Sequence, residues 1–182
     1  MTRSLGEALS LLADKGDINL ENSISRGIER ESLRVSKDNT ISGANHPSSL
    51  GSALTNKFIT TDFSEALLEL ITPTHSSIEN VLNNLDEICK FVVEETPETI
   101  WPSSIPCKIE NEGSIRLADY GTSNSGLLKT LYRSGLSYRY GSMMQTVSGI
   151  HYNFSFSDAF FESLKGEEDL QSFKNKSYLS LI

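Results

Sequence analysis

Between residues 149 and 156, apolar residues alternate with small or polar ones, and the apolar side consists of Ile150, Tyr152, Phe154 and Phe156. Because successive side chains of a strand point to opposite faces, this pattern predicts a half-buried strand with its aromatic side on the core. The other side carries His151 among small residues, so we expect it to form the wall of a binding site. A hydrogen-bonded structural histidine is the alternative.

A second alternating segment, residues 27–35, is rich in charge. As a helix it has no apolar stripe, whereas as a strand it places Glu29, Glu31 and Leu33 on one face. We therefore predict a strand, followed by a hairpin turn at residues 37–40 and a short partner strand.

Residues 58–73 fit two readings. A helix or a strand would place Glu65 and Glu69 on one face. The dipeptide Thr72–Pro73 favours an extended exit, so we predict a single strand here.

Three segments have helical spacing of their apolar residues. The clearest is residues 76–95, capped by Ser76 or Ser77, with an apolar face that we expect to cover the sheet. We also predict a helix with basic and tyrosine side chains at residues 126–140 and a short amphipathic helix at residues 4–13.

Composition excludes several classes of protein. The 182 residues carry a formal net charge of -8 without a run of Lys or Arg, which argues against nucleic-acid binding. No apolar stretch is long enough to span a membrane, and two cysteines do not make a disulfide framework, so we expect a cytoplasmic protein. The Gly- and Ser-rich residues 120–126 lack the Lys-Ser/Thr ending of a phosphate-binding P-loop.

The acidic residues suggest a metal site. Glu29 and Glu31 share a strand face roughly 6–7 Å apart along the strand, where they repel each other unless they share a cation. Asp62, Glu69 and His151 on two other segments complete a plausible cluster for Mg²⁺ or Mn²⁺, which prefer oxygen ligands.

A different interpretation needs no metal. Glu29 and Glu31 would then pair with Arg30, Arg34 or Lys37 on an exposed sheet face, as surface carboxylates commonly do.

Several sequence blocks in the same order resemble the proteobacterial type of glutamate–cysteine ligase, also called γ-glutamylcysteine synthetase. The blocks are Arg26–Arg34, Thr60–Glu69, Trp101–Pro102, Tyr120–Asn124, Thr130–Arg133 and Met144–Phe154. The resemblance implies an α+β fold of the glutamine-synthetase-like type, with a curved, mainly antiparallel sheet and helices on one face. It also implies that residues 1–182 are the N-terminal part of a single catalytic domain, truncated at its C-terminal end, so we expect a fragment.

The resemblance implies a reaction as well. ATP phosphorylates the γ-carboxylate of L-glutamate, and the amine of L-cysteine attacks the γ-glutamyl phosphate to give γ-glutamylcysteine, the first step of glutathione biosynthesis. Mg²⁺ or Mn²⁺ is the implied cofactor. The implied partners are L-glutamate, L-cysteine and ATP, without nucleic acid or membrane, and the implied state at full length is a monomer.

Roles carried over by position follow from the same resemblance. Glu31, Asp62 and Glu69 correspond to ligands of one Mg²⁺, and Glu29 and His151 to ligands of a second that takes a further Glu from outside this chain. Glu29, His151 and Arg133 are the implied catalytic residues, with Arg133 as a clamp for the transferred phosphate. The implied substrate-binding residues, which include the cysteine pocket, are Tyr132, Arg133, Leu136 and Gln145.

Two alternatives stay open from the sequence. One is a related carboxylate–amine ligase with a different amine acceptor, and the other is a non-catalytic metal-binding fragment. Because the remaining pocket and ATP-site residues of the family lie downstream, we expect this polypeptide alone to be inactive.

Overall fold

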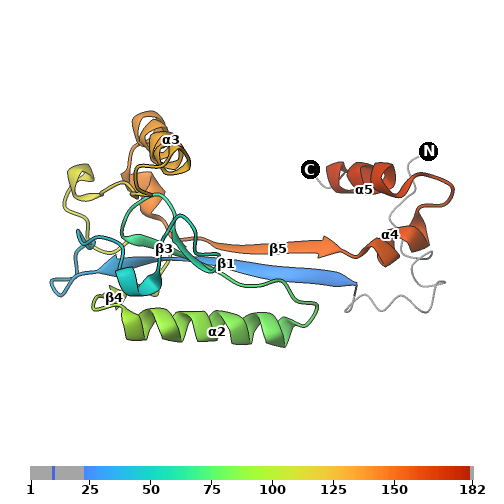
Figure 1. Ribbon diagram of the computed structural model, residues 1–182, viewed down its shortest axis with the longest axis horizontal. Coiled ribbons are helices and arrows are strands. Elements are labelled where there is room, and N and C mark those ends of the chain that lie inside the picture. Colours follow the sequence, from blue (N-terminus) through green and yellow to red (C-terminus); the bar gives the residue numbers. More distant parts are fainter. Residues whose placement is uncertain (1–9, 11–22, 181–182) are drawn as a thin grey trace. The chain divides into compact units, whose positions relative to one another are not determined.

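Strand β1 (Ile24–Val35) lies at the centre of a five-stranded sheet. β3 (Leu67–Ile71) pairs antiparallel with β1, and β2 (Ile59–Thr61) pairs antiparallel with β3. β4 (Thr99–Ile100) and β5 (Ile150–Phe156) also pair with β1 (Figure 1). The computed structural model describes residue 10 and residues 23–180, and it confirms an α+β fold with a mainly antiparallel sheet and the predicted strand at residues 27–35.

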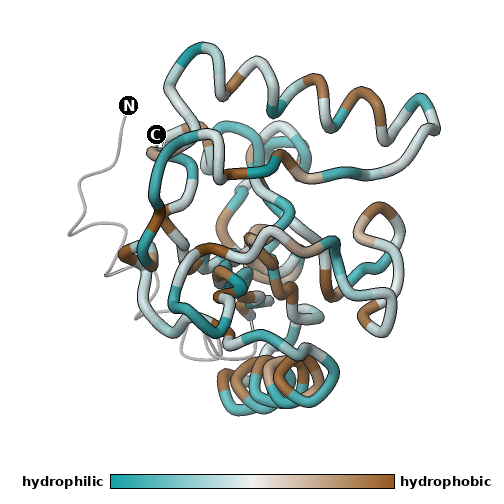
Figure 2. Tube along the Cα trace, turned by 90° about the vertical axis from the view of Figure 1, so that its left-hand side faces the viewer, coloured by the Kyte–Doolittle hydropathy of each residue, from teal (hydrophilic) through white to brown (hydrophobic). Residues whose placement is uncertain are grey.

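One face of the sheet is covered by α2 (Ile78–Glu95), as the spacing of its apolar residues predicts. Leu68 and Leu70 of β3 point to this face and form a buried cluster whose other members are Leu50, Ile59 and Val92. Leu85, Ile88 and Cys89 also pack against this cluster, so α2, which is seen nearly end-on at the bottom of Figure 2, presents an apolar stripe to the strands.

The opposite face carries α3 (Asn124–Tyr140), and Figure 1 shows α2 and α3 on the two sides of the sheet. Leu33, Val35 and Leu67 form the centre of the buried cluster on this face, and Leu136 of α3 packs against it. The helix begins where the Ser123 hydroxyl accepts a hydrogen bond from the Gly126 N–H at 3.1 Å, which satisfies one of the free amides of the first turn.

The prediction of one strand over residues 58–73 is wrong. Two antiparallel strands, β2 and β3, are joined by a turn in which the Leu67 N–H donates to the Ser64 carbonyl at 3.0 Å. Glu65 lies in this turn and therefore does not share a strand face with Glu69. Both Glu65 carboxylate oxygens accept backbone N–H groups from elsewhere in the chain, and no local pattern reveals these long-range contacts.

The strand predicted after Gly149 is confirmed as β5, but its aromatic side does not face a core. Ile150, Tyr152 and Phe154 are 67%, 56% and 47% exposed. Alternation with a period of two determines which residues share a face, but it does not determine whether another element covers that face.

Contacts divide the chain into two compact units. Gly27–Pro73 and Glu79–Asn153 form the unit that contains most of the sheet, α2 and α3. In the other unit, α4 (Asp158–Leu164) and α5 (Leu170–Leu179) pack through aromatic rings, with Phe161 between Phe156, Phe173 and Tyr178.

Two further findings concern short segments and hydropathy. The turn predicted at residues 37–40 is present, and Val35 pairs with Ile41 as an isolated bridge in place of a full partner strand. The helix predicted at residues 4–13 lies outside the described residues. Within the described part of the chain, each helix is too short or too polar to cross a lipid bilayer.

Candidate active site

Two carboxylates face each other across the pair formed by β1 and β3. The register places Glu31 directly opposite Glu69, and Thr60 of β2 is the partner of Glu69 on its other side. Like charges directly opposite on one sheet face destabilise the pairing unless another charge offsets them. The strands therefore build a local concentration of negative charge into the sheet.

Two more acidic residues act on this pair. Glu29 lies two residues before Glu31 on the same face, and Asp62 directly follows β2. Burial, followed by the negative charges of Asp62, Glu29 and Glu31, raises the pKa of Glu69 to about 7. Burial is also the main cause that raises the pKa of Glu31, with Asp62 and Glu29 adding to it.

Gly149 connects β5 to this cluster. Its N–H donates to Glu31 Oε2 at 2.6 Å, and the Glu31 N–H donates to its carbonyl at 2.9 Å. A Cβ at this position would lie 3.0 Å from His151 Nε2 and 3.4 Å from Glu31 Oε2, so glycine allows the close approach. His151 Nδ1 in turn lies 3.3 Å from Glu29 Oε2. The sequence singled out His151 but not the role of Gly149.

The basic residues of β1 do not neutralise these carboxylates. Arg34 donates to Glu98 Oε1 at 2.7 Å with its side chain fully buried, and Arg30 donates to Cys89 Sγ of α2 at 3.3 Å. Lys37 lines a separate cavity beside Glu98. The interpretation that Glu29 and Glu31 pair with Arg30, Arg34 or Lys37 on an exposed face is therefore wrong, because the alternation of the strand sends both arginines to the α2 side.

Arg133 of α3 is a cation that does reach the cluster. Its Nη2 lies 3.6 Å from Asp62 Oδ1, its Nε donates to the Asp62 carbonyl, and its Nη1 donates to the Lys129 carbonyl at 3.0 Å. The Arg133 side chain is 11% exposed, and these three contacts fix the position of its guanidinium group. A guanidinium held beside carboxylates in this way can also bind a phosphate.

The residues predicted for the cysteine pocket lie on consecutive elements. Tyr132 and Leu136 are one turn apart on α3, with Tyr132 64% exposed and Leu136 packed on the core. Gln145 belongs to the short helix η3 (Met143–Thr146) that follows. The three residues therefore lie on neighbouring helices of the chain, and the cysteine pocket stays a prediction.

The other four predicted metal ligands, Glu29, Glu31, Asp62 and His151, all act electrostatically on the fifth, because each contributes to the pKa of Glu69. Four carboxylates and an imidazole, partly withdrawn from water and repelling one another, are a donor set that suits a hard divalent cation. Among the residues that the structure describes, no three His, Cys, Asp or Glu side chains are already arranged to hold a metal ion. The donor chemistry fits, and the ligand assignment stays a proposal.

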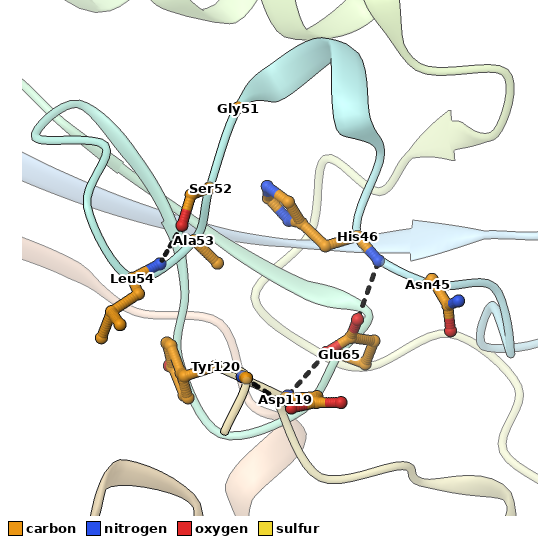
Figure 3. A pocket seen from close by; sticks show the side chains of 10 residues that line it. Asn45, His46, Gly51, Ser52, Ala53, Leu54, Glu65, Asp119 and Tyr120 are labelled. Carbon is orange, nitrogen blue, oxygen red and sulfur yellow. Dashed lines mark hydrogen bonds between the residues drawn. The ribbon is translucent and has the colours of Figure 1, made fainter. Parts of the chain in front are cut away.

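Glu65, in the turn between β2 and β3, lines a cavity of about 370 Å³ together with His46, Asp119 and Tyr120 (Figure 3). Glu65 Oε1 accepts the His46 N–H and Oε2 accepts the Asp119 N–H, both at 2.8 Å, so one buried carboxylate ties two loops together. Burial, and then the charge of Arg34, lowers the pKa of His46. Sequence reasoning missed Glu65 and Tyr120 as parts of the site's support.

A family model described as glutamate-cysteine ligase matches residues 9–182. Glutamate–cysteine ligases from Vibrio vulnificus (strain YJ016) and Pseudoalteromonas translucida (strain TAC 125) are 50% and 47% identical, over 86% and 100% of this chain. The matches cover 31% and 35% of those relatives, so the chain spans about a third of their length.

Solved structures agree with this similarity. The crystal structure of a glutamate–cysteine ligase from Francisella tularensis in complex with AMP superposes with a TM-score of 0.77 at 44% identity, over 81% of this chain and 30% of that one. A bifunctional glutathione synthetase from Pasteurella multocida gives a TM-score of 0.79 at 33% identity, over 92% and 22%.

Proposed function

Because the chain belongs to the glutamate–cysteine ligase family, we propose that it is the metal- and substrate-binding N-terminal part of a single catalytic domain in a longer ligase. The complete protein joins the γ-carboxylate of L-glutamate to the amine of L-cysteine at the expense of ATP, and it works as a monomer in the cytoplasm. The AMP bound to the relative from Francisella tularensis supports the use of ATP.

The observation that carries this proposal is the direct opposition of Glu31 and Glu69 across β1 and β3, with Asp62 and Glu29 close enough to act on Glu69. A fold gains nothing from placing four carboxylates together unless a cation balances them. Mg²⁺ or Mn²⁺, bound together with nucleotide phosphates, supplies that balance.

We assign the proposed ligands to two sets. Glu29 and His151 are in contact at 3.3 Å and would hold one ion. Glu31, Glu69 and Asp62 form the other set, since Glu31 and Glu69 are cross-strand partners and Asp62 is the charge that acts most strongly on Glu69. The ions, when bound, offset the negative charge of the phosphates during phosphoryl transfer.

The chain's own side chains supply binding and orientation. Arg133, already fixed beside Asp62 and the Lys129 carbonyl, offers the remaining N–H of each outer guanidinium nitrogen to the phosphate that is transferred. One side of the cysteine pocket is supplied by Tyr132, which directly precedes Arg133, by Leu136 one turn further along α3, and by Gln145 on η3. The rest of the glutamate, cysteine and ATP sites belongs to the part of the enzyme beyond this chain, so residues 1–182 alone have no ligase activity.

The test uses the full-length protein with ATP, L-glutamate and Mg²⁺, and follows phosphate release and product formation with L-cysteine and with other small amines as acceptors. We expect turnover with L-cysteine that is lost in Glu69→Gln and kept in Glu162→Gln, an exposed carboxylate of α4. Turnover with another amine but not with L-cysteine would show that the enzyme uses a different amine acceptor from the one proposed.

The alternative without catalysis makes a different prediction. A non-catalytic metal-binding fragment would bind Mn²⁺ without turnover in the full-length protein. A titration with Mn²⁺ in which wild type and Glu29→Gln bind equally weakly would contradict the metal site itself.

A further inference from the structure

Tyr120 is buried at 5% exposure in the loop that leads to α3. Its hydroxyl donates to the Thr61 carbonyl at 2.5 Å and lies 3.2 Å from the Asp62 carbonyl. These two carbonyls belong to the backbone that carries the Asp62 carboxylate out of β2. The phenol hydroxyl therefore fixes the backbone of Asp62, whose side chain is a proposed metal ligand.

The face of the same ring supports two cations. The Arg133 guanidinium carbon lies 4.7 Å from the ring centroid and Lys129 Nζ lies 4.9 Å from it. A cation over the face of a tyrosine is attracted by the ring, and more strongly where water is excluded. Arg133 also donates from Nε to the Asp62 carbonyl, so one ring contacts both the guanidinium and the backbone that the guanidinium binds.

Helix α3 can approach the ring because Gly126 has no side chain. A Cβ there would overlap the Tyr120 carbonyl oxygen and lie 2.8 Å from the Gly121 carbonyl oxygen. Thr130, one turn further along, donates to the Ala118 carbonyl at 3.2 Å. The first two turns of α3 are thus seated directly on the loop, which places Arg133 above the ring.

The loop that carries Tyr120 is held from its other side. The Asp119 N–H donates to Glu65 Oε2 at 2.8 Å, next to the cavity shown in Figure 3. Glu65 is 4% exposed and its backbone carbonyl accepts from Arg34 Nη2 at 2.9 Å. The loop that carries the ring is therefore fixed by the buried carboxylate of Glu65.

We propose that Tyr120 is a positioning residue of the ligase site, whose hydroxyl sets the Asp62 carboxylate and whose ring sets the Arg133 guanidinium. The inference rests on the proposed function, because it gives Asp62 and Arg133 their roles. It adds that the metal ligand and the phosphate clamp are aligned by one side chain that touches neither metal nor substrate.

The two contributions are separated by two substitutions in the full-length protein. Tyr120→Phe keeps the ring and removes the hydroxyl, so we expect the Kd for Mn²⁺ to rise about 3- to 10-fold, the factor that matches one lost hydrogen bond. Tyr120→Leu removes the ring as well, and we expect kcat to fall by a further factor on the order of 10 while the KM for L-glutamate changes little. Mn²⁺ binding is measured by titration without substrates.

Tyr178→Phe is the matched control. It deletes a phenol hydroxyl that accepts the Phe156 N–H at 2.9 Å in the unit formed by α4 and α5. We expect its Mn²⁺ affinity and kcat to equal those of the wild type. Thermal unfolding of each variant shows whether it is folded.

A double-mutant cycle with Arg133→Lys distinguishes positioning from a general structural role. If the ring acts through Arg133, Tyr120→Leu has less effect on kcat in the Arg133→Lys background than in the wild type. Equal factors in both backgrounds would overturn the role of the ring, and an unchanged Mn²⁺ affinity in Tyr120→Phe would overturn the role of the hydroxyl. Should Tyr120→Leu fail to fold, the Mn²⁺ affinity of Tyr120→Phe alone decides.

The outcomes for the wild type separate this inference from the proposed function. An active wild type with a Tyr120→Phe variant indistinguishable from it contradicts the inference alone. A wild type that neither turns over nor binds Mn²⁺ contradicts the proposed function, and the inference falls with it.

Discussion

The two faces of β1 treat charge in opposite ways. On the face covered by α2, Arg34 is fully buried but bound to Glu98, and two backbone carbonyls accept from its Nη2. On the other face, Glu29 and Glu31 share the sheet with Glu69, and their own strand supplies no counter-charge. A buried charge with a partner in the protein stabilises the fold. A group of like charges without such partners indicates that the site binds a ligand of opposite charge.

The largest effect is expected from breaking the paired side. Arg34→Met removes the ionic partner of Glu98, whose side chain is 12% exposed, and breaking a buried ion pair in this way costs about 3–5 kcal/mol of stability. Urea unfolding of the full-length protein measures it. Arg116→Met, which removes an exposed arginine bound to the Gly43 carbonyl and Asn45, should cost less than about 1 kcal/mol. Equal losses of stability in the two variants would mean that the buried Arg34–Glu98 pair contributes no more to stability than an exposed arginine.

On the unbalanced side, removal of a charge should have the opposite sign. Glu69→Gln relieves the repulsion from Glu31 and Asp62, so the metal-free protein should unfold at a higher urea concentration than the wild type. Its affinity for Mn²⁺ should fall by at least the roughly 10–100-fold typical of residues that only support a metal site. Glu162→Gln, the exposed control, should change neither quantity. If the metal-free Glu69→Gln protein were less stable than the wild type, Glu69 would stabilise the fold, and the two faces of β1 would not differ in this respect.

The seat of α3 on the carboxylate face can be tested with two glycines of the same helix. Gly126→Ala places a methyl group against the carbonyls of Tyr120 and Gly121, and overpacking of this kind costs about 1–3 kcal/mol. Gly135→Ala meets nothing within 4 Å and should stabilise the helix by roughly 0.5–1 kcal/mol. Thermal unfolding of the two variants compares them, and the same sign for both would contradict the close approach of the helix.

The smallest effect concerns His46, near Arg34 on the paired side. Its pKa in the folded protein is below the ordinary 6.5, because burial and the charge of Arg34 disfavour the imidazolium. The stability that His46 contributes is therefore present above pH 6.5 and is lost as the pH falls through that value toward the lower pKa of the folded state. Unfolding between pH 7 and 5 should depend less on pH in His46→Gln than in the wild type or in His75→Gln. An unchanged pH dependence in His46→Gln would contradict this.

The elements with strong periodicity could be predicted from sequence, but their surroundings could not. The strand at residues 27–35 and the helix α2 follow from spacing alone. The turn between β2 and β3 could not be predicted, because the Glu65 carboxylate that holds it binds N–H groups 19 and 54 residues away. The exposed aromatic side of β5 was mispredicted for a related reason, since burial depends on what covers a face.

The candidate site shows the same division. The residue types and their alternation singled out Glu29, Glu31, Asp62, Glu69 and His151, and the resemblance to the family divided them between two ions. The support around them is made by backbone groups and by residues without an ionisable signal, such as Gly149 and Tyr120. Only the register of the sheet shows that Glu31 and Glu69 are partners.

The double link between Gly149 and Glu31 has a consequence for how this segment tolerates insertions and deletions. With the Gly149 end of β5 anchored to β1, one added residue between Gly149 and His151 would move the imidazole to the far side of the ribbon and bring an apolar side chain toward Glu29. Two added residues would return it to the correct side, one repeat further along. Homologous proteins that keep this chemistry should therefore vary in length elsewhere and keep the spacing from this glycine to the histidine fixed.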